Sequence, residues 1–317
     1  GGNKNMPEPK SLHIDAVLTN LSIQYKTEEL IWEFLMPLIK VGKRSDKYYK
    51  YNKADSFTIP NDKIGPKSLP NEFDWGVSDD NYSVKDHALG DWLPQETIDN
   101  SDNPLQPEVD TNDFLNKLLA LAQEKRVADI VFAAASYPSG NKTQLSGTAQ
   151  WGGSADDPID NISLAVETCF QRANTLVFGQ DAWRKFRKLP EILDAVKSSS
   201  RFQGSPGGLA TGIEVAGLFE VDRIVVGRAR YNTAKEGQTA SYSRLWGKHC
   251  AALYVEKNPG LKSITFGLTI SEMLKQTQRD FDMKRGIKGA HYFKVAWNSD
   301  EKIVASDVGY LIEDAVA

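Results

Sequence analysis

The stretch DTNDFLNKLLALAQEKRVADIVFAAASYP, residues 110–138, carries the clearest helix signal in the sequence. Polar and acidic residues at its start favour a helix N-terminus, and Phe114, Leu118 and Leu121 then recur at helical spacing. We predict a helix over residues 111–135, which at 1.5 Å per residue would be about 37 Å long. Such a length is unusual in a compact domain and is typical of a rod on which other elements are laid.

On the C-terminal side of this helix the pattern becomes mixed α/β. After a Gly-rich loop, Pro158 is placed to begin a second helix. The predicted strands are 175–178, 223–230, 250–255, 263–270, 291–297, 302–305 and 308–312, and the predicted helices are 180–187, 190–196 and 213–219. Asn298-Ser299-Asp300 is expected to turn a hairpin between the strands on either side of it.

A segment on the N-terminal side of the helix is highly charged and poor in aliphatic residues. Basic residues dominate 40–67 and acidic residues dominate 72–110, and adjoining stretches of opposite sign favour pairing within the chain or between chains. Loose alternation predicts a long two-armed hairpin with an irregular tip. Such a segment buries too little surface to offset the entropy of ordering, so it is either disordered or ordered by lying on another molecule. The aromatic residues Trp75, Tyr82 and Trp92 favour the second interpretation.

The composition narrows the class of protein. The 317 residues are 40% hydrophobic and 25% charged, which excludes disorder as the main state. A formal net charge of −4 argues against a protein whose main task is to neutralise phosphate, and no apolar run is long enough to span a membrane. We expect Cys169 and Cys250 to be free, buried thiols in a protein made in a reducing cytoplasm.

Motifs for catalysis, metal binding and cofactor binding are missing from the sequence. The four histidines lie far apart, and none has a partner four residues on. The glycines at 204–212 lack the Gly-Lys-Ser/Thr of a phosphate-binding loop, and there is no Gly-x-Ser-x-Gly motif. We therefore predict that the protein uses no cofactor and no metal.

Two basic segments remain to be interpreted. A cluster over residues 183–188 surrounds two aromatic residues with Arg and Lys, which fits either a contact with an acidic partner or polynucleotide, or, as we favour, a solvated face behind buried rings. Arg223, Arg228 and Arg230 alternate along a predicted strand, a pattern more typical of an interaction rim than of a catalytic site.

A series of short motifs extends in a characteristic order over most of the chain. The motifs are Leu18-Thr19-Asn20, Ser45-Asp46-Lys47-Tyr48-Tyr49, Asp74-Trp75-Gly76-Val77, Tyr82-Ser83, Asp99 to Pro107, Ser146-Gly147-Thr148-Ala149-Gln150-Trp151, Asn174-Thr175-Leu176-Val177-Phe178-Gly179, Pro190-Glu191-Ile192-Leu193, Val221-Asp222-Arg223, Tyr231-Asn232-Thr233-Ala234, Glu236-Gly237-Gln238 and Leu245-Trp246-Gly247-Lys248-His249. Each motif alone is weak, but in this order the chain resembles the major capsid (coat) proteins of tailed double-stranded-DNA bacteriophages.

The resemblance implies an α+β fold with an N-terminal arm, an extended β-hairpin loop, a peripheral domain that contains the long spine helix, and an axial domain of mixed α/β structure. The implied boundaries are 1–40 for the arm, 41–98 for the extended loop, 99–174 and 271–302 for the peripheral domain with the spine helix at 111–135, and 175–270 and 303–317 for the axial domain.

The resemblance also implies a structural function in the virion. Proteins of this family assemble as pentamers and hexamers into an icosahedral shell that encloses the double-stranded DNA without sequence-specific binding. Assembly in the cytoplasm of the bacterial host, with scaffolding, portal and decoration proteins as partners, is expected. No active site is expected, and no membrane is involved.

Candidate intersubunit contacts come from the two arms of the extended loop and from a polar loop in the axial domain, which we place at a local symmetry axis. They are Lys47, Lys50, Lys53, Lys63, Lys67, Asp74, Trp75, Asp79, Asp80, Trp92, Tyr231, Asn232, Glu236 and Gln238. A lysine at the loop tip, Lys63 or Lys67, is in principle able to form an isopeptide bond with an Asn of a neighbour, although solvated tip lysines are far more common.

Two other functions stay open at this point. The first is an encapsulin-like nanocompartment shell with an enzyme cargo, for which the apolar arm residues around Leu18 would supply a docking groove. The second is a soluble enzyme with His87 or His249 as base, which would leave the aliphatic-poor loop unexplained. The start at Gly1-Gly2 fits either a tag remnant or proteolytic removal of a preceding segment.

Overall fold

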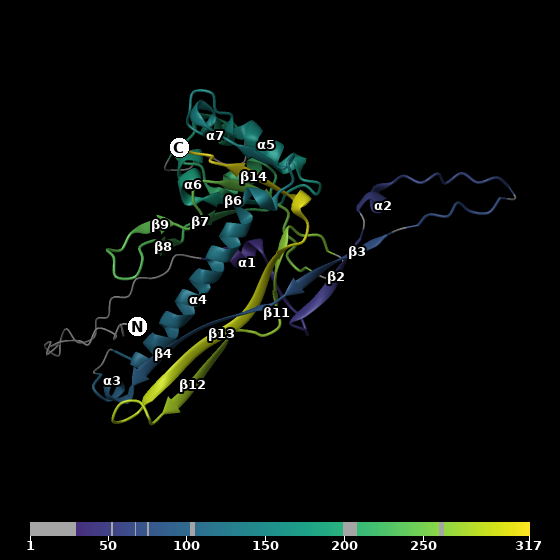
Figure 1. The fold of residues 1–317 in the computed structure, drawn as a ribbon. Helices are drawn as coiled ribbons and strands as arrows, with labels where there is room; N and C mark the ends of the chain where they lie inside the picture. The colour runs from purple at the N-terminus through teal and green to yellow at the C-terminus, as the bar shows by residue number, and fades with distance from the viewer. Residues whose placement is uncertain are drawn as a thin grey trace.

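The computed structural model describes residues 30–51, 53–66, 68–74, 76–101, 105–198, 208–259 and 263–317. The chain folds around two β-sheets that are joined by one long helix, with a hairpin loop that projects to one side (Figure 1). Residues 1–29 of the predicted arm lie outside the described residues. The described part of the arm holds α1 (Trp32–Leu35) and β1 (Leu38–Lys40).

The first sheet, which we call the upper sheet from its place in Figure 1, has the order β5-β14-β10-β6-β7. Its central strands are buried at nearly every position, as the short runs of apolar residues predict for strands covered on both faces. The strands are β5 (Lys142–Gln144), β6 (Thr175–Gly179), β7 (Arg223–Gly227), β10 (Cys250–Leu253) and β14 (Gly309–Glu313). Strand β7 is parallel to β6 and forms one edge of the sheet.

Four helices cover one face of the upper sheet. They are α5 (Pro158–Thr168), α6 (Gln180–Phe186), α7 (Pro190–Ser198) and α8 (Gly212–Leu218). The Asp157 side chain caps α5 by accepting from the N–H of Asp160, and Thr211 with Glu214 forms a capping box on α8. Together they enclose an aromatic core that includes Trp151, Phe178, Trp183, Phe186 and Phe219.

The long helix α4 (Pro107–Val131) connects the two sheets. Val127, Ala128 and Val131 in its last turns pack in the core on the other face of the upper sheet. Its earlier residues Leu115 and Leu119 pack on the second sheet. Helix α4 therefore contributes side chains to the hydrophobic cores of both sheets.

This helix has the predicted length, but it begins at Pro107 rather than at Thr111 and ends at Val131 rather than at Ala135. Proline is favourable at the first helical position because its missing N–H would have no partner there. At the other end, the Tyr137 hydroxyl donates to the Val131 carbonyl at 2.6 Å. The chain then passes through the short 3₁₀ helix η1 (Ala134–Ser136).

The second sheet, the lower sheet, is organised around β13 (Ala290–Ile303), a strand of 14 residues. It pairs along its length with β4 (Lys85–Pro94), β12 (Gln276–Asp282) and β11 (Gly267–Ser271), and β11 pairs in parallel with β1. The predicted hairpin turn at residues 298–300 is wrong, because these residues continue β13. Asn298 is buried in this strand and its side-chain oxygen accepts from the N–H groups of Glu272 and Met273.

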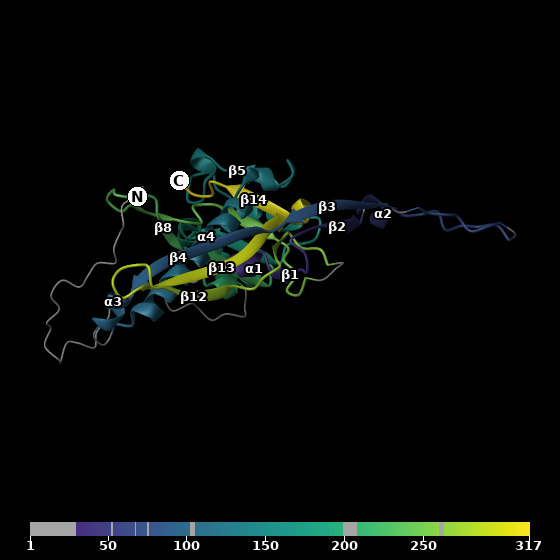
Figure 2. The same cartoon turned by 60° about the horizontal axis from the view of Figure 1, so that its bottom comes forward.

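The projecting loop begins with the antiparallel pair β2 (Ser45–Tyr51) and β3 (Val77–Ser83) and extends away from both sheets (Figure 2). The short helix α2 (Lys53–Phe57) lies at its base. Residues 85–94 were predicted as part of the extended loop, but as β4 they belong to the lower sheet and lead into α3 (Gln95–Asp99). The remaining elements are β8 (Arg230–Asn232), β9 (Tyr242–Arg244), η2 (Gly147–Ala149) and η3 (Ser306–Val308).

Two further segments differ from the expected division of the chain. Residues 142–173, expected in the peripheral domain, contribute β5 and α5 to the upper sheet and its core. Strand β11, expected in the axial domain, pairs with β1 and β13 of the lower sheet. Both differences arise from long-range strand pairing and helix packing, which local sequence patterns do not report.

Candidate intersubunit surfaces

The stem of the extended loop pairs its opposite charges within the chain. Lys47 Nζ lies 2.5 Å from the Asp79 carboxylate, whose pKa is held below its usual value by that hydrogen bond. The Tyr48 hydroxyl donates to Asp80 at 3.0 Å, and the Lys302 ammonium lies 3.3 Å from the same carboxylate. The candidates Lys47, Asp79 and Asp80 therefore contribute to an intramolecular ladder in the subunit.

Beyond this stem the loop exposes apolar side chains. Ile59 is 93% exposed, Leu69 is 87% exposed, and Phe73 is half exposed. The candidates Lys63 and Asp74 lie exposed on the same segment. Lys67, Trp75 and the side chain of Lys50 lie outside the described residues. Exposed apolar groups gathered on one extended segment make it a candidate for a surface that another molecule covers.

The base of the loop packs against residues next to the upper sheet of its own chain. Lys53 of α2 forms an ion pair with Asp307 and lies 3.3 Å from the centroid of the Phe170 ring. Phe57, at the end of the same helix, meets Phe170 edge to face at 4.8 Å. Lys53 is thus engaged within the subunit, and it fixes where the loop leaves the body.

Trp92 also has its partners within the chain. Its ring packs on Tyr292 of β13 at 4.7 Å, and the Arg285 guanidinium lies 3.9 Å from its centroid. The neighbouring tip between β12 and β13 exposes Met283 (69%) and Ile287 (92%). The sequence analysis did not select this tip, although the run Met283-Lys284-Arg285-Gly286-Ile287-Lys288 between two strands was a usable signal.

The polar loop of the upper unit joins β8 to β9 and projects from it (Figure 1). Tyr231 and Asn232 lie in β8, and the Asn232 side-chain oxygen accepts from the N–H groups of Ala234 and Ser241, each at 3.0 Å. Glu236 and Gln238 lie exposed at the tip. The structure therefore brings these four candidates together on one projecting hairpin.

Glu124 is a buried carboxylate that the sequence analysis did not select. Its buried carboxylate accepts from the backbone N–H of Ile31 at 3.0 Å, from that of Trp32 at 2.9 Å and from the Trp246 indole at 2.6 Å. Burial raises the pKa of this carboxyl group, while the three hydrogen bonds act in the opposite direction. Trp246 in turn covers Gly227, where a Cβ would lie 2.1 Å from the ring. The arm, the spine helix and the upper sheet meet at this carboxylate.

The remaining reactive side chains are placed as follows. Cys169 and Cys250 are free and buried, as predicted, and burial raises the pKa of both thiols. His249 accepts at Nδ1 from the N–H of Asp314 at 3.0 Å. Among the described residues, no cluster of His, Cys, Asp and Glu is arranged to hold a metal ion. The described helices include none long and apolar enough to cross a membrane.

The sequence is similar to a curated phage protein over its whole length. The major capsid protein of Pseudomonas phage JBD67 is 33% identical over 316 residues, which cover 99% of each chain. The chain belongs to the family of phage major capsid proteins. The major capsid protein of Burkholderia phage BcepMu is 30% identical over 255 residues, 78% of each chain. No protein-family model matches the sequence.

The fold of this major capsid protein is found in solved phage capsids. The capsid of cyanophage P-SCSP1u superposes with a TM-score of 0.66 at 9% identity, covering 95% of this chain and 93% of the other. This likeness confirms the predicted α+β capsid fold. The subunit is a structural component of a virion shell built from many copies. The family assignment confirms this predicted function rather than that of a nanocompartment shell or of a soluble enzyme.

Proposed function

We propose that this major capsid protein assembles as pentamers and hexamers into an icosahedral shell around the double-stranded DNA of a tailed phage. The observation that supports this most directly is the extended loop, which holds Ile59 and Leu69 almost fully in solvent. A second molecule that covers these side chains removes them from water and so stabilises the segment. In a shell, that molecule is the neighbouring subunit.

The projecting elements suit contacts of two kinds. The loop carrying Lys63 and Asp74 lies across the adjacent subunit, and Lys67 and Trp75 belong to the same segment. The hairpin carrying Tyr231, Asn232, Glu236 and Gln238 lies at the local symmetry axis of each capsomer. On this proposal the upper sheet with α5 to α8 is the axial domain, and the lower sheet with α4 is the peripheral domain.

The charge of the protein suits enclosure of DNA rather than tight binding. A net charge of −4 gives few counterions to release against phosphate, so the genome is held without sequence-specific contacts. We propose assembly in the cytoplasm of the bacterial host, with scaffolding, portal and decoration proteins as partners.

Sedimentation velocity with negative-stain imaging tests this proposal. Closed particles or rings of five and six subunits at near-physiological salt are the expected result. A homogeneous monomer that stays monomeric with scaffold and crowding agents would overturn it. The particle diameter then gives the number of capsomers in the shell.

A further inference from the structure

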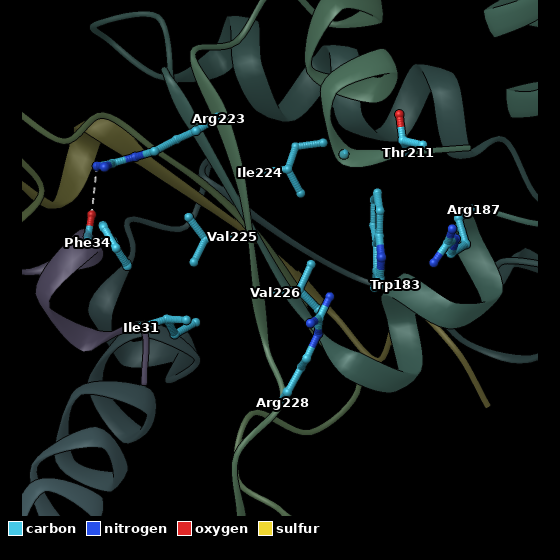
Figure 3. Close-up of a pocket in the computed structure, with 11 residues that line it drawn as sticks. Ile31, Phe34, Trp183, Arg187, Thr211, Arg223, Ile224, Val225, Val226 and Arg228 are labelled. Carbon is cyan, nitrogen blue, oxygen red and sulfur yellow. Dashed lines mark hydrogen bonds between the residues drawn. The ribbon is translucent and has the colours of Figure 1, made fainter. Parts of the chain in front are cut away.

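A groove of about 460 Å³ opens at the edge of the upper sheet, beside strand β7. The side chains of β7 alternate between its two sides, as Figure 3 shows. Ile224 and Val226 face Trp183 of α6, with Arg187 beyond the ring and Arg228 at the end of the strand. Figure 3 also shows Arg223 and Val225 on the opposite side, toward Ile31 and Phe34 of the α1 region.

The backbone of β7 is available along this groove. In the described chain β7 pairs with β6 on one side and with no strand on the other. An edge strand with free N–H and C=O groups is a template for one more strand. The groove is therefore shaped for an extended peptide that has side chains on both of its faces.

The charges at the groove define the chemistry of that peptide. The Arg223 guanidinium group already has partners in its own chain, since it donates to the Phe34 carbonyl at 2.8 Å and to Thr175 Oγ1 at 3.1 Å. Arg187 and Arg228 form no ion pair among the described residues, and the buried Nε of Arg187 has no hydrogen-bond partner there. On the other side, Phe34 is 45% exposed. The matching strand carries carboxylates on one face and an apolar ring on the other.

The extended loop offers such a segment in residues 72–74, which belong to no strand of their own subunit. Glu72 and Asp74 alternate with Phe73, and both carboxylates are exposed with no ion pair in the described chain. Phe73 is 50% exposed. The loop leaves the body on the side opposite β7 (Figure 1), so one copy offers the strand where the next offers the groove. Head-to-tail contacts generate closed rings when the rotation between neighbouring copies closes.

We propose that residues 72–74 of one subunit add as a strand to the free edge of β7 in the next subunit of the capsomer. Phe73 then packs against Phe34, and Glu72 and Asp74 face Arg187 and Arg228. This inference rests on the proposed shell function and names the receiving site for the loop. The contact closes the groove and continues the upper sheet of one subunit into the loop of its neighbour.

Disulfide trapping in assembled particles tests the contact. The double variant Asp74→Cys with Arg228→Cys is expected to give covalent ladders up to five and six subunits on a non-reducing gel. The matched control joins Asp74→Cys to Glu191→Cys, an exposed position on α7 away from the groove. The native thiols do not interfere because both are buried.

The outcomes separate the inference from the function on which it rests. Particles that form without a ladder stronger than that of the control overturn the inference and leave the shell function standing. That result would also be found if residues 1–29, which lead into Leu30 beside the groove, filled it instead. A wild-type chain that gives no particles overturns the shell function and the inference together.

Exchange of the charges at positions 74 and 228 is a second test, which can be used if the cysteine variant fails to assemble. Asp74→Arg and Arg228→Asp are each expected to lower the yield of particles several-fold, and the combined variant is expected to restore most of it. Both positions are exposed in the subunit, so neither change disturbs its core. A combined variant that assembles no better than the single variants would overturn the contact.

Discussion

The upper sheet and the extended loop use similar residues in opposite ways. In the upper sheet, Phe178 is fully buried among Trp151, Trp183 and Phe186, with ring centroids 5.2 to 6.1 Å away. In the loop, Phe73 is half exposed and Ile59 is almost wholly in solvent. The first region obtains its stability from contacts inside one chain, and on the proposed shell function the second obtains it from another chain. The apolar content of a segment therefore does not say which molecule will bury it.

Substitution of Phe178 is expected to have the largest effect on the stability of the subunit. Phe178→Ala removes a ring from a closed core and leaves a cavity, so we expect the free energy of unfolding to fall by about 3–5 kcal/mol. Urea unfolding of the dissociated subunit, followed by Trp fluorescence, measures the change.

Phe73→Ala is the matched control, because it removes the same side chain from the loop. We expect its free energy of unfolding to stay within about 0.5 kcal/mol of the wild type, while particle assembly is impaired. Equal destabilisation by the two variants would remove the distinction between the regions.

A second prediction concerns Asn298, the polar residue that holds the lower sheet to the segment after β11. Asn298→Ala leaves the N–H groups of Glu272 and Met273 without their acceptor, and we expect a loss of about 2–3 kcal/mol. Asn100→Ala, at an exposed position, is expected to change the same unfolding midpoint little. An Asn298 variant as stable as the Asn100 variant would show that those N–H groups find other partners.

A third and smaller effect is expected at Glu124. Glu124→Gln replaces one of two accepting oxygens by an amide group, at a cost of about 1–2 kcal/mol at neutral pH. Because burial raises the pKa of Glu124 in the folded protein, the folded chain binds this proton more tightly than the unfolded chain does. The stability linked to this proton is present at low pH and is lost as the pH rises through the raised pKa.

The wild type should therefore gain stability relative to Glu124→Gln as the pH is lowered from neutrality toward the ordinary range of a carboxyl group. Unfolding midpoints of both proteins over that range measure the difference, with Glu191→Gln as a control for the loss of one exposed carboxylate. A difference that stays constant or shrinks on acidification would contradict this linkage.

Much of the fold could be predicted from the sequence, and the failures have identifiable causes. The spine helix and the strands at 175–178 and 250–255 were predicted from local patterns, and the structure has all three. The buried face of the helix, however, carries Leu115 and Leu119 rather than Phe114 and Leu118. The turn at Asn298 was predicted because Asn is common in turns. In the structure Asn298 is buried in a strand, and its side-chain oxygen accepts from the Ser271 hydroxyl and from the N–H groups of Glu272 and Met273. The pairing of β4 with β13 is long-range and leaves no local signal.

For the candidate surfaces, the structure places residues within one subunit. The charge reversal between the arms of the loop pointed to Lys47 and Asp79, and these residues do pair, within one chain. The alternating arginines at 223 and 228 indicated an interaction rim, and they line the groove beside β7. That β7 is an edge strand follows only from the strand order of the whole sheet. Glu124 was missed because a single acidic residue on a helix is usually solvated.

The position of Glu124 has a mechanical consequence. The described chain starts at Leu30, and the next two residues are already tied to this carboxylate. A pull on the preceding chain therefore loads the spine helix at Glu124 and, through the Trp246 indole, the upper sheet as well. The force is then shared by the cores of both sheets and does not act only on the pairing of β1 with β11 at the edge of the lower sheet. Tension on the arm would therefore reach the subunit at a carboxylate that is fully buried.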